Sequence, residues 1–142
     1  MTLFNKILIA VDLSYLEGAK KAVKTALAMV EGNPDAVLRV VSIIPPLGNS
    51  FVSSLLPRNF DKDVLAEAHK RLHAFTEENF PKECKVQHIV AHGTVYEEIN
   101  TLAQEKNVDL IIMMATKPGK PGLSSNTVKV ARFSEKPILI LR

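Results

Sequence analysis

The sequence predicts one α/β domain with a doubly wound, parallel, five-stranded sheet and helices on both faces. Short apolar runs rich in branched residues alternate with amphipathic segments along all 142 residues. No change of composition and no linker interrupts this alternation. Strands that alternate with helices form a mostly parallel sheet joined by right-handed crossovers. The predicted domain therefore spans residues 1–142.

The five expected strands are short runs dominated by Val, Ile and Leu. Continuous apolar runs of this kind are typical of strands that are covered on both faces. They cover residues 6–11, 36–44, 86–91, 110–114 and 137–141.

The segments between these strands carry apolar residues at helical spacing. The first begins near Leu16 and ends at Gly32-Asn33-Pro34, a combination that stops helices. Further helices are expected over residues 61–80 and 95–105, and a last one contains residues 129–134. Residues 47–58 mix Gly, Asn, Ser and Pro with scattered apolar residues, which predicts an irregular segment near one end of the sheet.

The composition argues against several classes of protein. A net charge of +3 from 18 basic and 15 acidic residues, scattered along the chain, does not predict nucleic-acid binding. No apolar run approaches the roughly 20 residues of a membrane span, and no signal peptide is predicted. The lone Cys84 excludes an internal disulfide and suits a reducing compartment. We therefore expect a cytoplasmic protein in which Cys84 is a structural thiol.

A ligand site is expected where the strands end. In open α/β sheets, ligands bind at the carboxyl ends of the strands. Val11, Asp12 and Ser14 follow the first strand, and Ile43, Ile44 and Pro45 end the second. The carboxylate of Asp12 could bind a ribose hydroxyl or a metal that accompanies phosphates. Alternatively, Asp12 or Ser14 could simply cap the first helix.

The loop over residues 115–126 makes the most specific prediction in the chain. It follows a buried strand, is rich in Gly, Pro and Ser, and precedes a helix. That order places backbone N–H groups and a helix N-terminus where they can hold an anion, typically a phosphate. The alternative is that Ser124, Ser125 and Asn126 only cap the helix and turn the chain.

Other chemistry is not predicted by the spacing of residues. His69 and His73 have the i, i+4 spacing of two zinc ligands, but no acidic or sulfur ligand pattern accompanies them. Neither a Gly-x-Ser-x-Gly elbow nor a phosphate-binding Walker loop occurs. A catalytic role beyond slow nucleotide hydrolysis is therefore not expected.

Several segments resemble the bacterial universal stress protein family, and the resemblance covers essentially the whole chain. It is strongest for the UspF/UspG-like branch of that family. The segments that carry it are residues 6–14, 108–114, 114–119, 123–126 and 130–142.

The resemblance implies the strand order 3-2-1-4-5 and a nucleotide site that holds ATP or ADP with Mg²⁺. It also implies a homodimer, in which the apolar last strand pairs with its twin through Ile138, Leu139, Ile140 and Leu141. The adenosine contacts carried over to this chain are Val11, Asp12 and Ile43. The phosphate contacts carried over are Lys117, Gly119, Ser124, Ser125 and Asn126.

The loop departs from the family's pattern in ways that concern phosphates. Met114 and Ser124 stand where the family has glycine, and the six residues between Lys117 and Ser124 make the loop three residues shorter. The side chain of Met114 could fill part of the nucleotide's space. Two functions therefore remain open: a nucleotide-binding sensor or switch, and a dimeric scaffold that binds no nucleotide and acts through protein partners.

Overall fold

A computed structural model of the chain describes residues 3–45 and 60–142. The predicted irregular segment, residues 47–58, lies outside the described residues. The helices are α1 (Leu16–Met29), α3 (Phe60–Asn79), α4 (Val95–Glu105) and α5 (Ser125–Phe133). The strands are β1 (Lys6–Ala10), β2 (Val37–Ile44), β3 (Lys85–His92), β4 (Leu110–Met114) and β5 (Ile138–Leu141).

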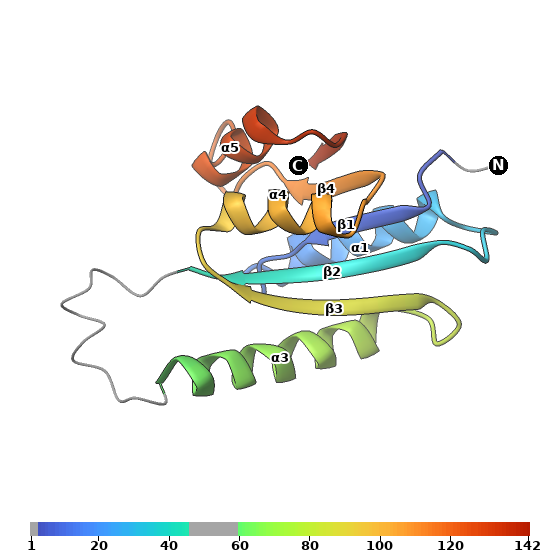
Figure 1. Cartoon of the computed structure of the whole chain (residues 1–142), viewed down its shortest axis with the longest axis horizontal. Coiled ribbons are helices and arrows are strands. Elements are labelled where there is room, and N and C mark those ends of the chain that lie inside the picture. The colour runs from blue at the N-terminus through green and yellow to red at the C-terminus, as the bar shows by residue number, and fades with distance from the viewer. Residues whose placement is uncertain (1–2, 46–59) are drawn as a thin grey trace.

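The five strands form one parallel sheet in the order β3-β2-β1-β4-β5 (Figure 1). This confirms the predicted class and the strand order implied by the family resemblance. The predicted boundaries of several elements differ from the observed ones by one or two residues, because the ends of helices and strands depend on local hydrogen bonds that periodicity does not report.

Helices cover both faces of the sheet, as Figure 1 shows. On one face, α1 and α3 pack on a core that includes Ile7, Ile9 and Leu72. On the other, α4 and α5 pack on Leu8, Ile111 and their neighbours. The three central residues of β1, Ile7, Leu8 and Ile9, point alternately to opposite faces and are fully buried. The continuous apolar runs therefore reflect a sheet that is covered on both sides.

The shortest element, β5, lies at one edge of the sheet beside β4. None of the described helices is long and apolar enough to cross a membrane.

Candidate functional site at the carboxyl ends of the strands

A cavity of about 400 Å³ opens where β1, β2 and β4 end. The start of α1, the loop after β4 and the first turn of α5 complete its walls. The volume lies in the range of roughly 300–1,000 Å³ that is usual for small-molecule sites. Because the strands are parallel, their carboxyl ends meet at this edge, and the strand order changes direction at β1 and β4.

Most of the residues predicted from the sequence line this cavity. They are Val11, Asp12, Ile43, Lys117, Ser124 and Asn126. Two predicted residues, Gly119 and Ser125, are exposed and do not line it. The structure therefore brings six of the eight predicted residues to one cavity and leaves Gly119 and Ser125 outside its lining.

Asp12 is held in a fixed orientation by the residue two positions further on. Its Oδ1 accepts hydrogen bonds from the Ser14 backbone N–H at 2.9 Å and from the Ser14 hydroxyl at 2.6 Å. The N-cap of α1 is Tyr15, whose side chain makes no capping hydrogen bond. The alternative that Asp12 or Ser14 caps this helix is therefore wrong, because the chain needs one further turn before the helix begins.

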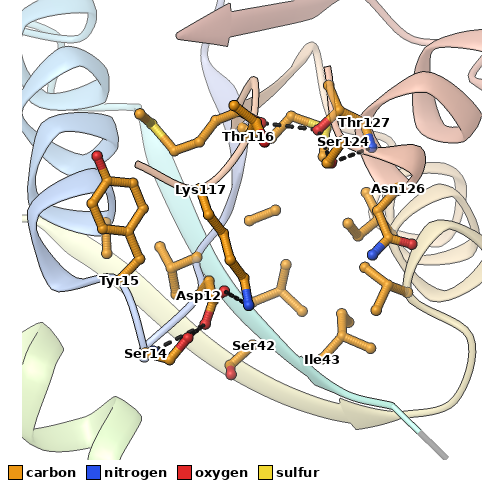
Figure 2. Close-up of a pocket in the computed structure, with 18 of the residues that line it drawn as sticks. Asp12, Ser14, Tyr15, Ser42, Ile43, Thr116, Lys117, Ser124, Asn126 and Thr127 are labelled. Carbon is orange, nitrogen blue, oxygen red and sulfur yellow. Dashed lines mark hydrogen bonds and ion pairs between the residues drawn. The ribbon is translucent and has the colours of Figure 1, made fainter. Parts of the chain in front are cut away.

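Lys117 approaches Asp12 from the opposite wall. Figure 2 shows its side chain extending from the loop after β4 toward the carboxylate. Its Nζ lies 4.0 Å from Asp12 Oδ2, and the two side chains are 66% and 51% exposed. At this exposure the ion pair is worth little, roughly 0–1 kcal/mol. A ligand with an anionic group could therefore replace the carboxylate as the partner of Lys117 at small cost.

The first turn of α5 is organised by two hydroxyl groups. Ser124 is the N-cap, and its Oγ accepts a hydrogen bond from the Thr127 backbone N–H at 3.1 Å. The Thr127 hydroxyl donates to the Met114 carbonyl at 2.9 Å. The two hydroxyl oxygens are 2.8 Å apart. Since the Thr127 proton is already directed at Met114, the Ser124 hydroxyl donates to Thr127.

Thr127 was not among the residues predicted from the sequence to form the site. It is 1% exposed and ties α5 to the end of β4. Its position three residues after a serine N-cap is where a polar side chain commonly completes a capping arrangement, and this spacing was a signal that could have identified it.

The floor of the cavity is apolar. Val41, Ile99 and Met113 line it, and all three are buried members of one apolar cluster on the α4 and α5 face of the sheet. Val11 lines it as well and belongs to the core on the opposite face. An apolar floor with a few polar groups at its rim suits a flat, largely apolar group whose orientation is set by hydrogen bonds.

One wall depends on a glycine within a helix. A Cβ at Gly18 would lie 2.6 Å from the Tyr15 ring and 3.2 Å from Met114 Cγ. Both of these side chains line the cavity. Gly18 therefore allows Tyr15 and Met114 to pack against α1. The only sequence signal was a glycine in a helix interior, a position where glycine costs roughly 1 kcal/mol relative to alanine.

Outside the cavity, the histidines do not form a metal site. His73 Nε2 lies 3.0 Å from Glu77 Oε1, and the His73 ring meets the His88 ring edge-on with centroids 5.1 Å apart. Within residues 3–45 and 60–142, no three His, Cys, Asp or Glu side chains are grouped so that they could hold a metal ion.

Cys84 is half-buried beside the end of α3. Burial and the neighbouring Glu83 carboxylate raise the pKa of its thiol. Since the thiolate is the nucleophilic form, a raised pKa lowers its reactivity at neutral pH.

The chain is similar to proteins of known family along almost its full length. The sequence model of the universal stress protein family matches residues 3–142. Universal stress protein G of Shigella flexneri is 24% identical over 144 residues, which cover 99% of this chain and 100% of that protein. The protein of the same name from Escherichia coli O157:H7 shows the same identity and coverage.

Solved structures share the fold. A hypothetical protein whose biochemical function was assigned from its structure is 25% identical, with a TM-score of 0.82 and coverage of 98% of this chain and 96% of that chain. Universal stress protein UspA from Lactobacillus plantarum is 18% identical, with a TM-score of 0.72 and 98% coverage of both chains. A universal stress protein in complex with cAMP is 20% identical, with a TM-score of 0.61 and coverage of 98% and 97%.

The parallel sheet in the order 3-2-1-4-5, the cavity at its strand ends and the match across residues 3–142 agree with one another. The chain therefore belongs to the universal stress protein family.

Proposed function

We propose that this chain is a stress-response protein that binds an adenine nucleotide in the cavity at the ends of β1, β2 and β4. One observation carries the proposal: Asp12 and Lys117 stand on opposite walls of a cavity with an apolar floor. An acceptor for hydroxyls, a cation for phosphate and an apolar surface for a base are the three elements that a nucleotide requires. The solved universal stress protein in complex with cAMP supports the same ligand class.

Each part of the cavity has a role in this proposal. The base would pack on the floor formed by Val41, Ile99 and Met113. Asp12 Oδ2, which takes no hydrogen bond from Ser14, would accept a hydrogen bond from a ribose hydroxyl. Lys117 would turn from the carboxylate toward the phosphate, where the first turn of α5 adds its positive dipole end.

This arrangement suggests how ligand occupancy could be sensed. Without ligand, Lys117 bridges the loop after β4 to Asp12. A bound nucleotide would engage both side chains separately, so that the loop contacts the phosphate in place of the β1 end. A partner that binds the surface of this loop would then distinguish the nucleotide-bound protein from the free protein.

The test is direct binding to a variant that lacks the carboxylate. Asp12→Ala should weaken adenine-nucleotide binding about tenfold or more, because a charged acceptor for a hydroxyl contributes roughly 1.5–3 kcal/mol. Isothermal titration calorimetry would measure this, after chromatography of small molecules released from the denatured wild-type protein. Asp63→Ala, on the exposed side of α3, is the matched control. Binding that Asp12→Ala leaves unchanged, or a wild-type protein that gives no heat with any adenine nucleotide, would contradict the proposal.

A second candidate is a dimeric scaffold that acts through protein partners. It is favoured by the edge position of β5, because a strand edge with free backbone groups can pair with a second copy. Met114 in the cavity wall, where the family has glycine, also favours it.

A further inference from the structure

We propose that the cavity selects a ligand with a single phosphate group, such as an open or cyclic nucleoside monophosphate, over a diphosphate or triphosphate. This rests on the proposed nucleotide function and narrows it. The described residues of this site fit ATP and ADP, which the family resemblance implies, less well than a monophosphate. The reasons are the number of donors, the charge, the loop geometry and the single carboxylate that these residues offer to a magnesium ion.

Few hydrogen-bond donors face the cavity on its phosphate side. The Ser124 hydroxyl donates to Thr127, and the Thr127 hydroxyl donates to the Met114 carbonyl, so neither is free. The Thr127 N–H is taken by the Ser124 cap. What remains among the described residues that line this side is the Lys117 ammonium, the Thr116 hydroxyl, and the side-chain amide and backbone N–H of Asn126, an N–H that has no intrahelical acceptor. These suffice for one phosphate group.

The charged side chains of the cavity provide one cation, and therefore one charged partner for a phosphate group. Among the described residues that line it, Lys117 is the only cation and Asp12 the only carboxylate. One phosphate can take Lys117 as its partner, while Asp12 binds a hydroxyl. Each further phosphate adds negative charge near Asp12 with no second cation among these residues, and an unpaired charge in a partly desolvated site is costly.

The loop after β4 turns away from the cavity too early to wrap a longer phosphate chain. The Lys120 N–H donates to the Lys117 carbonyl at 3.4 Å, and Gly119 between them has φ +77°. Pro118 followed by a glycine with positive φ matches a type II turn. A Cβ at Gly119 would meet nothing within 4 Å, so glycine is favoured at this position by its positive φ and not by close packing against another group.

The base of the same loop is closed. The Ser124 N–H donates to the Ala115 carbonyl at 2.7 Å. On the other side of the loop, Arg142 Nη1 donates to the Gly122 carbonyl at 3.4 Å. With both ends held and the tip outside the cavity, only Thr116, Lys117 and Ser124 of this loop reach the ligand space.

The structure also offers little to a magnesium ion that would accompany a triphosphate. Mg²⁺ in nucleotide sites is usually held by one or two carboxylates together with phosphate oxygens. Asp12 alone is present among the lining residues described, and its Oδ1 already accepts two hydrogen bonds from Ser14. A single carboxylate oxygen would remain, and the same oxygen is needed for the ribose.

The experiment compares ligands that differ only in phosphate number. Adenosine, AMP, cAMP, ADP and ATP would each be titrated calorimetrically into the full chain, with and without Mg²⁺. We expect AMP or cAMP to bind about tenfold more tightly than adenosine, since one charge-assisted contact is added. We expect ADP and ATP to bind no more tightly than the better monophosphate, in either buffer.

A matched pair of variants locates the effect. Lys117→Met should lower the affinity for the monophosphates to that of adenosine, a loss of about tenfold, while adenosine itself changes less than about twofold. Lys120→Met, in the same loop but outside the cavity, should change neither affinity. If Lys117→Met and Lys120→Met weaken monophosphate binding equally, the assignment of Lys117 is wrong.

The outcomes separate this inference from the proposed function. ATP with Mg²⁺ binding tenfold more tightly than AMP, with the gain lost in Asp12→Ala, would overturn the phosphate preference and leave nucleotide binding standing. No binding of adenosine or of any of the four nucleotides would overturn the proposed function and this inference with it.

Discussion

At the scale of single residues, the cavity is defined by side chains that come from different elements. Lys117 and Asp12 are separated by most of the chain, yet their charged atoms lie 4.0 Å apart. Met114 is the last residue of β4, and its side chain lines the cavity. We therefore expect the choice of ligand to depend on a few side chains at the rim of the cavity.

Met114 provides the first prediction at this scale. Met114→Gly should raise the affinity for ADP relative to AMP by about tenfold, as expected if the side chain imposes about 1.4 kcal/mol against a longer phosphate chain. The physical reason is that the methionine occupies wall space beside Gly18 and Tyr15. Calorimetry with both nucleotides measures the ratio.

The conservative variant Met114→Leu is the control for that prediction. It keeps an apolar side chain of similar size, and it should keep the wild-type ratio of ADP to AMP affinity. If the glycine variant is folded, as judged by its circular dichroism, and its ratio is also unchanged, then Met114 does not limit the ligand.

At the scale of elements, α5 is held to the sheet through its first turn. Ser124 caps the helix, and Thr127 links it to the Met114 carbonyl at the end of β4. The helix thereby gains a fixed start beside the cavity, which Asn126 and Thr127 line. Both hydroxyl groups donate their protons to neighbours within the protein, so neither is a free donor to a ligand.

Thr127→Val tests this connection. The substitution keeps the shape of the side chain but removes its hydroxyl, leaving the Met114 carbonyl and the Ser124 hydroxyl without their partner. It should lower the free energy of unfolding by about 1–3 kcal/mol, the usual cost of an unsatisfied buried polar group. Urea denaturation measures this. Thr101→Val, on the exposed side of α4, should change it by less than about 0.5 kcal/mol.

At the scale of the whole molecule, β5 is an edge strand, and no other described strand pairs with its outer side. The Pro137 carbonyl accepts a hydrogen bond from the Ile111 N–H of β4, and the Leu141 carbonyl accepts one from the Ala115 N–H just after β4. In a parallel ladder the residues that face one neighbour alternate with those that face the other side. Ile138 and Ile140 therefore direct their backbone N–H and C=O groups outward, where a second copy of the chain would meet them.

This register yields a prediction about assembly. Ile140→Pro removes an outward N–H without removing a donor to β4, so it should weaken a dimer formed through β5 while the monomer stays folded. Size-exclusion chromatography with light scattering would show the mass fall from that of a dimer to that of a monomer. Ile140→Val, which keeps the N–H, should remain dimeric. A dimer that persists in the proline variant would place the interface elsewhere.

Much of this architecture could be predicted because its signals are local. The apolar runs predicted the five strands, since burial on both faces requires continuous hydrophobic sequence. The positions of Asp12 after the first strand and of the loop after the fourth predicted that both lie at the same edge of the sheet. The strand order itself was implied by family resemblance, because periodicity does not report which strands are neighbours.

At two positions, residue type alone left more than one role open. Asp12 has the chemistry of a helix cap, yet the helix begins one turn later and Tyr15 takes that position. Gly119 has the conformational freedom that suits close approach to a phosphate, yet it forms a turn outside the cavity. In both cases the residue type allowed two roles, and the path of the backbone selected one.

By itself, the sequence determined the layered fold, the edge of the sheet where a ligand would bind and the cap at Ser124, because each follows from patterns within a few residues. Only the tertiary structure decided that Thr127 ties α5 to β4, that Tyr15 and Met114 share a wall at Gly18, and that Lys117 reaches Asp12. These contacts join residues far apart in the chain, so they depend on how the helices pack against the sheet.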